Sequence, residues 1–167
     1  MSQLPYRYCL DANVLIQAWQ KYYSPKICPE YWKLLERLGH SQRIFLAKDV
    51  EEEIMKTEDE LSQWLKSSGI PIYPREGSVL LCLKKIFETD PTHLRLVDNI
   101  KGRSLADPWV IAHAMDQDAC VVTKEAKQTT QTNRIKIPNV CEKMGVRCID
   151  DFQFIRELGI SFSCTMA

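Results

Sequence analysis

The chain has 167 residues, of which 45% are hydrophobic and 26% are charged, and its 22 basic residues balance 22 acidic ones. These proportions are typical of a soluble globular protein and predict a single domain over residues 1–167. The zero net charge excludes a general attraction to nucleic acid or to an anionic membrane, so any polyanion must be bound by a local cluster of Lys and Arg.

Strand-like and helix-like segments alternate along the chain, which predicts an α/β fold with a mostly parallel sheet covered by helices on both faces. The elements predicted for the first half are a strand at 7–10, a helix at 13–21, a helix from Pro29 that ends at Gly39, a strand at 44–47 and a helix from Asp49 to about Lys66. Asp49 is expected to cap the last of these helices, with Glu52 completing a capping box.

The second half continues the alternation and adds a long polar loop. Its predicted elements are an edge strand at 70–73, helices at 78–87 and 92–97, a helix that Asp107 caps ahead of Pro108, a strand at 119–123, a loop at 124–136, a helix at 139–144 that Gly145 ends, a strand at 146–149 and a helix at 151–158 that Asp151 caps and Gly159 ends. The Asp–Pro pair is typical of a helix start.

No apolar stretch is long enough to predict a membrane span. The longest uninterrupted apolar run is Val79 to Leu83, whereas a transmembrane helix needs ~20 residues. Arg7 and Asp11 interrupt the region where a signal peptide would be apolar. Seven cysteines occur without any CxxC spacing, which disfavours both a disulfide framework and a structural zinc site. We therefore expect a cytoplasmic protein with reduced cysteines.

Two aspartates stand where strand-like and helix-like segments meet. Asp11 ends the first strand, and Asp107 begins a later helix. Ligands of open α/β sheets bind at the carboxyl ends of the strands, and the first turns of the connecting helices lie at that same edge. An Asp before Pro is also a common helix cap with no further role, so Asp107 alone leaves both interpretations open.

Two glutamates extend this acidic group. On a helical wheel, Glu53 lies about 20° from Trp64 in the apolar stripe, Glu52 points away from that stripe, and Glu51 faces solvent. Glu125 follows the strand at 119–123 and belongs to the same sheet edge.

Other acids are weaker candidates. Asp116 and Asp118 precede the strand at 119–123 and are excluded, because they belong to the opposite edge of the sheet. Asp150 and Asp151 follow the last strand and remain rivals for the site.

Clustered carboxylates repel one another unless a cation lies among them. Because no His or Cys occurs at ligand spacing, the expected cofactor is Mg²⁺ or Mn²⁺, which prefer oxygen ligands. The histidines at 40, 93 and 113 are isolated, and no dinucleotide-binding, P-loop or GxSxG motif is present.

Four motifs, in order, resemble those of the PIN domain and, within it, the VapC-like toxin ribonucleases of bacteria. They are Leu10-Asp-Ala-Asn-Val-Leu15, Val50-Glu-Glu-Glu-Ile54, Leu105-Ala-Asp-Pro-Trp-Val-Ile-Ala-His-Ala114 and Val121-Val-Thr-Lys-Glu125. The resemblance implies a three-layer αβα fold with a five-stranded sheet in the order 3-2-1-4-5. It also implies a divalent-metal-dependent endoribonuclease, the toxin of a toxin–antitoxin pair, with RNA and a cognate antitoxin as partners and a homodimer as an open alternative.

By position, Asp11, Glu53 and Asp107 match the acidic triad of that family, which carries the metal and the catalysis. Glu125 stands at the fourth acidic position, usually Asp, so the resemblance leaves open whether its longer side chain ligates the metal directly. Asn13 and Thr123 match polar positions that orient the site. The chain is longer than is typical of these toxins, with extra residues around 76–103.

Local positive charge near these acids is expected to contact RNA phosphates without reading sequence. The residues concerned are Lys101, Arg103, Lys124, Lys127, Arg134 and Lys136.

Two alternatives remain. Asp11-Ala-Asn-Val14 and Ile149-Asp-Asp151 also resemble motifs of haloacid-dehalogenase-like phosphatases, in which Asp11 would be the nucleophile. That family usually has Asp where this chain has Asn13, and an amide cannot serve as the acid and base. The other alternative is a catalytically inactive PIN-like scaffold that only binds a partner.

Overall fold

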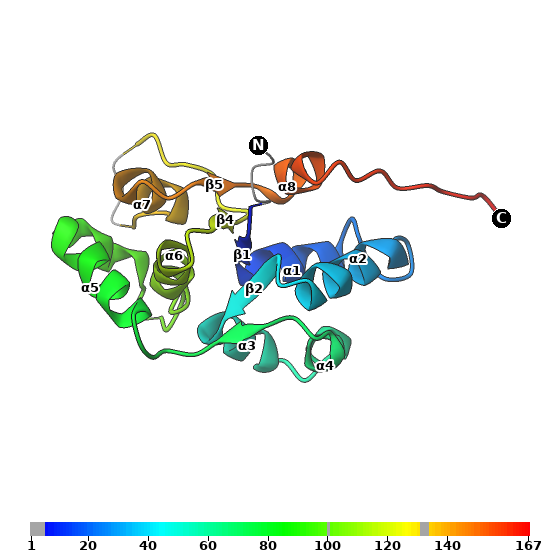
Figure 1. Cartoon of the computed structure of the whole chain (residues 1–167), viewed down its shortest axis with the longest axis horizontal. Coiled ribbons are helices and arrows are strands. Elements are labelled where there is room, and N and C mark those ends of the chain that lie inside the picture. Colours follow the sequence, from blue (N-terminus) through cyan, green and yellow to red (C-terminus); the bar gives the residue numbers. More distant parts are fainter. Residues whose placement is uncertain (1–5, 100, 131–133) are drawn as a thin grey trace.

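The computed structural model describes residues 6–99, 101–130 and 134–167 and contains a five-stranded parallel sheet in the order β3-β2-β1-β4-β5. The strands are β1 Tyr8–Leu10, β2 Ile44–Ala47, β3 Ile72–Tyr73, β4 Cys120–Val122 and β5 Cys148–Ile149. Both the strand order and the edge position of β3 confirm the sequence-based predictions. With helices on both sides of the sheet, the fold is a PIN-like αβα arrangement (Figure 1).

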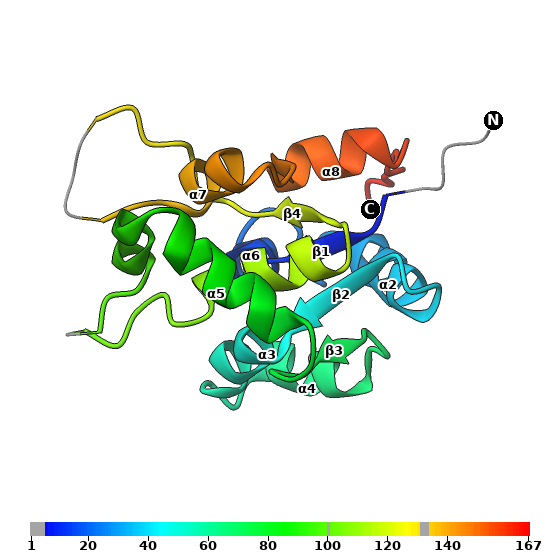
Figure 2. The same cartoon turned by 60° about the vertical axis from the view of Figure 1, so that its left-hand side comes forward.

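Helices connect the strands and form the two outer layers. They are α1 Ala12–Gln20, α2 Pro29–His40, α3 Lys48–Met55, α4 Glu60–Ser67, α5 Val79–Thr89, the 3-10 helix η1 Pro91–Leu96, α6 Asp107–Asp116, α7 Ile137–Met144 and α8 Asp151–Glu157. On one side of the sheet α6 lies against the central strands with α5 and α7 beside it, and α1 and α2 lie on the other side (Figures 1 and 2).

The central strands are buried on both faces. All residues of β1, β2 and β4 are buried, and Cys9, Leu10 and Val121 are fully inaccessible. Parallel strands covered on both faces read as continuous apolar runs without alternation, which is why these three segments were recognisable from the sequence.

The helix predicted from Asp49 to Lys66 is wrong, because the structure has two helices there. Asp59 begins α4 by accepting a hydrogen bond from Ser62 N at 2.9 Å, and the Ser62 hydroxyl in turn contacts Asp59 N, which completes a capping box. Asp49 is not a cap either, since Ala47 precedes the first turn of α3. Instead, Asp49 and Glu52 both bind the guanidinium of Arg75.

Three residues predicted to begin or end helices have other roles in the structure. Gly39 lies inside α2, where an added Cβ would come within 2.9 Å of the Ile70 Cα, so close packing rather than helix termination requires glycine. Asp107 is the first residue of α6 and makes no capping bond. Asp150, rather than Asp151, caps α8 by accepting from Gln153 N at 2.7 Å. Gly145 does end α7, in the left-handed conformation with φ +70°.

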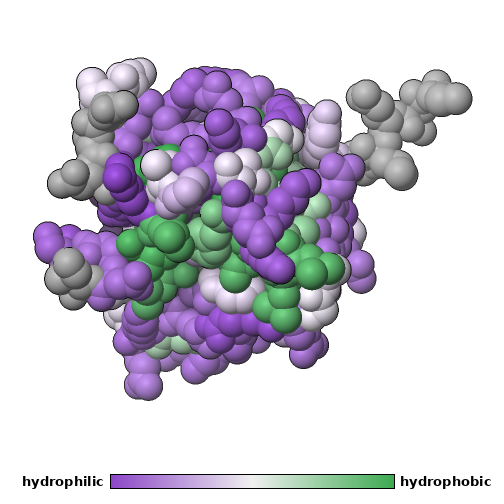
Figure 3. All heavy atoms as spheres, turned by 90° about the vertical axis from the view of Figure 1, so that its left-hand side faces the viewer, coloured by the Kyte–Doolittle hydropathy of each residue, from purple (hydrophilic) through white to green (hydrophobic). Residues whose placement is uncertain are grey.

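The extra segment around residues 76–103 forms α5, η1 and a turn. Ile86 of α5 holds this segment to the core, because its side chain is fully buried. Its carbonyl oxygen lies 2.7 Å from His93 Nδ1 of η1. The outer side of α5 exposes Leu80 and Leu81, which are 47% and 70% accessible. Seen from this side, apolar groups gather across the middle of the surface between hydrophilic margins (Figure 3). Within the described ranges, no helix has the length and apolar character needed to cross a bilayer.

Candidate active site

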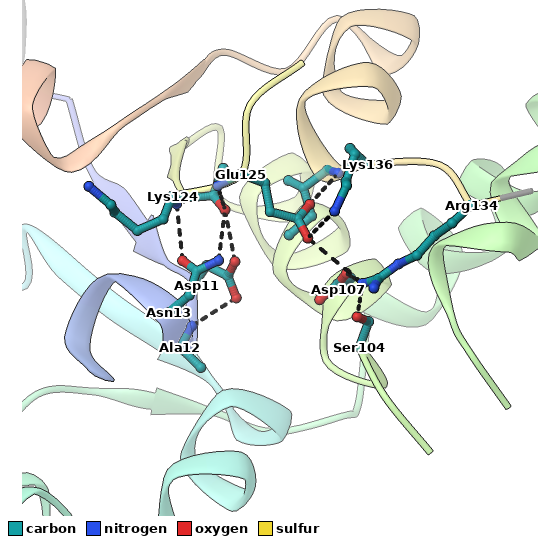
Figure 4. A network of polar contacts seen from close by, with 11 residues as sticks. Asp11, Ala12, Asn13, Ser104, Asp107, Lys124, Glu125, Arg134 and Lys136 are labelled. Atoms are coloured by element: carbon teal, nitrogen blue, oxygen red, sulfur yellow. Dashed lines mark hydrogen bonds and ion pairs between the residues drawn. The ribbon is translucent and has the colours of Figure 1, made fainter. Parts of the chain in front are cut away.

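The four predicted acidic residues come from four segments that meet at one edge of the sheet. Asp11 directly follows β1, Glu53 belongs to the helix after β2, Asp107 begins α6, and Glu125 lies just after β4 (Figure 4 shows all but Glu53). This is the edge formed by the carboxyl ends of the strands, where ligands bind in open α/β folds.

Asp11 is the most constrained of the four side chains. It is 4% exposed, and its two carboxylate oxygens accept hydrogen bonds of 2.8 Å from Ala12 N and from the Thr123 hydroxyl. Because Asp11 caps α1 and Thr123 follows β4, these bonds fix the carboxylate between the two central strands (Figure 4).

Asn13 and Thr123 link the segments that carry the acids. Asn13 Oδ1 accepts from the backbone N–H of Lys124 at 3.0 Å, and its amide nitrogen lies 3.5 Å from the Thr123 hydroxyl. Thr123 also accepts from the backbone N–H of Glu125 at 3.2 Å. The two polar residues therefore hold the β1–α1 and post-β4 segments together.

Asp107 and Glu125 share a cation supplied by the chain itself. Arg134 Nη2 lies 3.6 Å from Asp107 Oδ2 and 3.8 Å from Glu125 Oε1, and it also contacts the Ser104 hydroxyl (Figure 4). Lys136 Nζ is 3.9 Å from Glu125 Oε1. The other oxygen of Glu125 accepts from Ile137 N at 2.9 Å, at the start of α7.

Burial and the closeness of other acidic groups raise the pKa values of the carboxylates at this site. Burial raises the pKa of Asp11 to about 7, and the nearby charges of Glu125 and Glu53 add to the effect, while the Thr123 hydrogen bond opposes it. Burial, followed by the charges of Asp11 and Glu125, raises the pKa of Asp107 to about 8, against the lowering effect of Arg134. Glu53 lies on the more exposed side of α3, where partial burial raises its pKa and Lys56 lowers it.

Without divalent cations, these shifts should make the protein less stable as the pH rises. The pKa values of Asp11 and Asp107 in the folded protein, about 7 and about 8, exceed the ~3.9 of an unfolded Asp. Their contribution is therefore complete below about pH 4 and is lost as the pH rises through about 7 to 8. In EDTA, raising the pH from about 5 to about 8.5 should lower the melting temperature of Asp107→Asn by less than that of the unmodified chain. Parallel curves for the two proteins would contradict these pKa values.

The predicted phosphate-binding residues do not all face the acids. Lys124 Nζ forms a 2.8 Å ion pair with the buried Asp151 and lies 4.2 Å from the centroid of the Phe152 ring. Its side chain thus points away from the carboxylates, which corrects the phosphate contact predicted for it (Figure 4). Lys127 pairs with Glu142 on α7.

The remaining basic residues are more exposed or closer to the site. Arg134 and Lys136 lie at the carboxylates, whereas Lys101 and Arg103 are exposed on the segment before α6. The rival acids Asp150 and Asp151 lie elsewhere: the first caps α8, and the second binds Lys124 and the Tyr22 hydroxyl.

A groove of about 540 Å³ adjoins the site, and several of its residues were not identified from the sequence. Its lining consists of Asp49, Glu52, Glu53, Lys56, Arg75, residues 102–106 and Arg134. Ser104 combines a backbone φ of +58° with its contact to Arg134, and a left-handed serine leaves no mark in a sequence.

The donor set of the site fits a hard divalent cation. All four acidic side chains offer oxygen, and Asp107 Oδ2 is buried without a hydrogen-bond partner among the described residues. The raised pKa values of Asp11 and Asp107 show that an additional positive charge would be favoured there. In the described ranges no three acidic, His or Cys side chains are already gathered at metal-binding distance, so holding an ion would require the acids to move closer together.

Comparison with known proteins identifies a family and a fold. A family described as a domain of unknown function, DUF4411, matches residues 8–162. No curated protein matches the sequence significantly.

Among solved structures, a chain of VapBC2 from Rickettsia felis, crystallised with a DNA fragment from its promoter, superposes with a TM-score of 0.55 and 14% identity over 86% of this chain and 97% of that one. FitAcB from Neisseria gonorrhoeae gives a TM-score of 0.49 and 13% identity over 85% and 96% of the two chains.

Proposed function

The chain belongs to the DUF4411 family of domains of unknown function, and we propose that it is a divalent-metal-dependent endoribonuclease, the toxin of a toxin–antitoxin pair. The observation that supports this most strongly is the group of Asp11, Glu53, Asp107 and Glu125 at one edge of a PIN-like sheet. Burial, with a smaller contribution from the neighbouring acidic charges, raises the pKa values of Asp11 and Asp107, and a cation bound among these carboxylates would offset both effects.

Each residue of the site has a role that its position suits. Asp11, Glu53 and Asp107 would hold the cation, and Thr123 fixes the orientation of Asp11 through its 2.8 Å hydrogen bond. Once bound, such a cation supplies activation of a water molecule and stabilisation of the charge on a phosphodiester. Glu125, whose Oε2 is held by the α7 backbone, would act on the ion from further away.

The phosphatase alternative has less support. It requires an acid two residues after Asp11, but Asn13 there is committed through Oδ1 to the backbone of Lys124. It also requires Asp150 or Asp151 at the nucleophile, whereas Asp150 caps α8 and Asp151 pairs with Lys124. Activity that survives Glu53→Gln but not Asp150→Asn would favour it nonetheless.

RNA cleavage should require Mg²⁺ or Mn²⁺, stop in EDTA and be indifferent to chelators selective for zinc. The reason is that the proposed ligands are oxygen atoms, while four of the seven cysteines are buried. Cleavage of a labelled RNA, followed on a denaturing gel, tests this directly. Activity that persists in EDTA would exclude a metal-dependent mechanism.

The inactive-scaffold alternative is tested by calorimetry rather than by cleavage. A functional site should bind Mn²⁺ in the millimolar range or tighter, and Asp107→Asn should weaken that binding. Absence of heat with the unmodified chain would favour a scaffold.

An antitoxin is the proposed protein partner. Support comes from the resemblance to VapC-like toxins and from the similarity in fold to a chain of VapBC2. The exposed apolar surface that includes Leu80 and Leu81 of α5 is of the kind that mediates protein contacts.

A further inference from the structure

A polar groove opens directly beside the carboxylates, between α3 and residues 102–106. Its volume of about 540 Å³ lies within the ~300–1,000 Å³ typical of ligand pockets. Glu53 and Arg134 line the groove, and both also act electrostatically on Asp107. The groove is therefore continuous with the candidate active site.

One side of the groove is held by a charge-compensated arginine. Arg75 donates to Asp49 Oδ2 at 2.8 Å and binds Glu52, and its guanidinium carbon lies 6.0 Å from the centroid of the Trp109 ring on α6. These contacts tie α3 to α6 and compensate the charge of Arg75. Arg75 therefore shapes the groove, and because it is paired with two carboxylates it adds no net positive charge to it.

The opposite side is a short, hydrogen-bonded segment. Asp98 and Arg103 exchange two backbone hydrogen bonds of 3.1 and 3.0 Å, and Ser104 follows with φ +58°. A left-handed non-glycine residue is strained and persists only where surrounding contacts impose it. Here the Ser104 hydroxyl contacts Arg134, so this wall has a defined shape next to the acids.

Two exposed cations remain to act on a ligand. Lys56, which follows α3, and Arg103 on the opposite wall form no salt bridge with any residue that the structure describes, although Lys56 is close enough to Glu53 to lower its pKa. Leu105, which is 46% exposed, adds an apolar surface between Arg103 and the first turn of α6. Two exposed cations outside any described salt bridge and an apolar side chain, beside a site proposed to cleave phosphodiesters, suit a strand of phosphates with sugars and bases attached.

We propose that this groove binds the sugar–phosphate backbone of single-stranded RNA next to the cleaved bond. Arg103 and Lys56 contact phosphates, and Leu105 packs against a ribose or a base. The inference rests on the proposed ribonuclease function and specifies where its substrate lies. Lys56 thereby gains a role in binding the substrate. Arg103 contacts phosphate from this groove, which does not include Lys127.

Salt-dependent binding of a labelled single-stranded RNA of mixed sequence, measured by fluorescence anisotropy in EDTA, tests the groove without cleavage. The double variant Lys56→Ala/Arg103→Ala should bind about tenfold more weakly. Because each phosphate contact to a single strand contributes about 0.7 to the slope of log K against log salt, the slope should fall by about 1.4. A matched control, Lys21→Ala/Lys33→Ala, removes two exposed lysines that do not line the groove and should change neither quantity.

The outcomes separate the groove from the proposed function. If the unmodified chain cleaves RNA but the double variant keeps its affinity and salt slope, the groove assignment is overturned and the ribonuclease function stands. If the unmodified chain neither binds nor cleaves RNA, the proposed function fails and this inference fails with it. If the double variant keeps RNA binding but no longer binds a protein partner, the groove is a site for that protein and the RNA assignment is overturned. Unchanged melting temperatures establish that the variants are folded.

Discussion

Asp11→Asn should abolish RNA cleavage and make expression of the protein without its partner harmless, whereas the unmodified chain should arrest growth. Asp11 is held by Ala12 N and the Thr123 hydroxyl at the centre of the acidic group, so the exchange keeps the shape and removes one charge. Losing a cation ligand should remove several kcal/mol of transition-state stabilisation, and each ~1.36 kcal/mol corresponds to a factor of ten. We therefore expect the rate to fall at least about 100-fold.

Asp150→Asn is the matched control for this experiment. Asp150 is also an aspartate that caps a helix after a strand, but its carboxylate faces Gln153 N at the start of α8. This variant should keep its activity and lose about 1 kcal/mol of stability at most, since Asn is an equally good cap. Equal toxicity of Asp11→Asn and the unmodified chain would refute the assignment of Asp11.

Glu53→Gln should likewise abolish cleavage while leaving the fold nearly as stable. Among the three consecutive glutamates, only Glu53 lies close enough to raise the pKa of both Asp11 and Asp107. Glu52 binds Arg75, and Glu51 pairs with Lys48, so both have partners outside the acidic group. Cleavage rates and urea unfolding of the three single Gln variants distinguish these roles.

The neighbouring variants serve as controls. Glu52→Gln should keep activity and lose no more than about 1 kcal/mol, because the pair with Arg75 is exposed. Glu51→Gln should change stability by about 0.5 kcal/mol or less, as is usual for a surface position. Loss of cleavage in either of these, with full activity in Glu53→Gln, would show that the acidic position of this helix has been placed one or two residues away from the true one.

The sheet was predictable because its central strands are buried on both faces and leave continuous apolar runs. Residues 44–47 were placed without error, and β1 and β4 within one residue at each end. The chemistry at the strand ends was also visible, since Asp11 and Glu125 directly follow such runs. The order of the strands came from the resemblance of four motifs to a known family, and the structure confirms it.

The errors concern interactions between residues distant in the sequence. Asp49 and Glu52 have the spacing of a capping box, but Arg75, 23 residues beyond Glu52, takes both carboxylates. The helical wheel for Glu53 assumed one helix through Trp64, whereas α3 ends at Met55. Similarly, α7 starts at Ile137 rather than 139, where Glu125 accepts from its first N–H. No local pattern reports such partners.

The position of Arg134 bears on how tightly the proposed cation would bind. With a guanidinium 3.6 Å from Asp107 and 3.8 Å from Glu125, part of the negative charge is already balanced before any ion arrives. Binding of the proposed divalent cation would then be an exchange of one positive charge for another rather than a simple association. The carboxylates would then bind the ion only at higher concentrations than they would beside a neutral side chain. If the site holds the proposed cation, Arg134 would compete with it, and residue 134 would set the ion concentration at which the site can work.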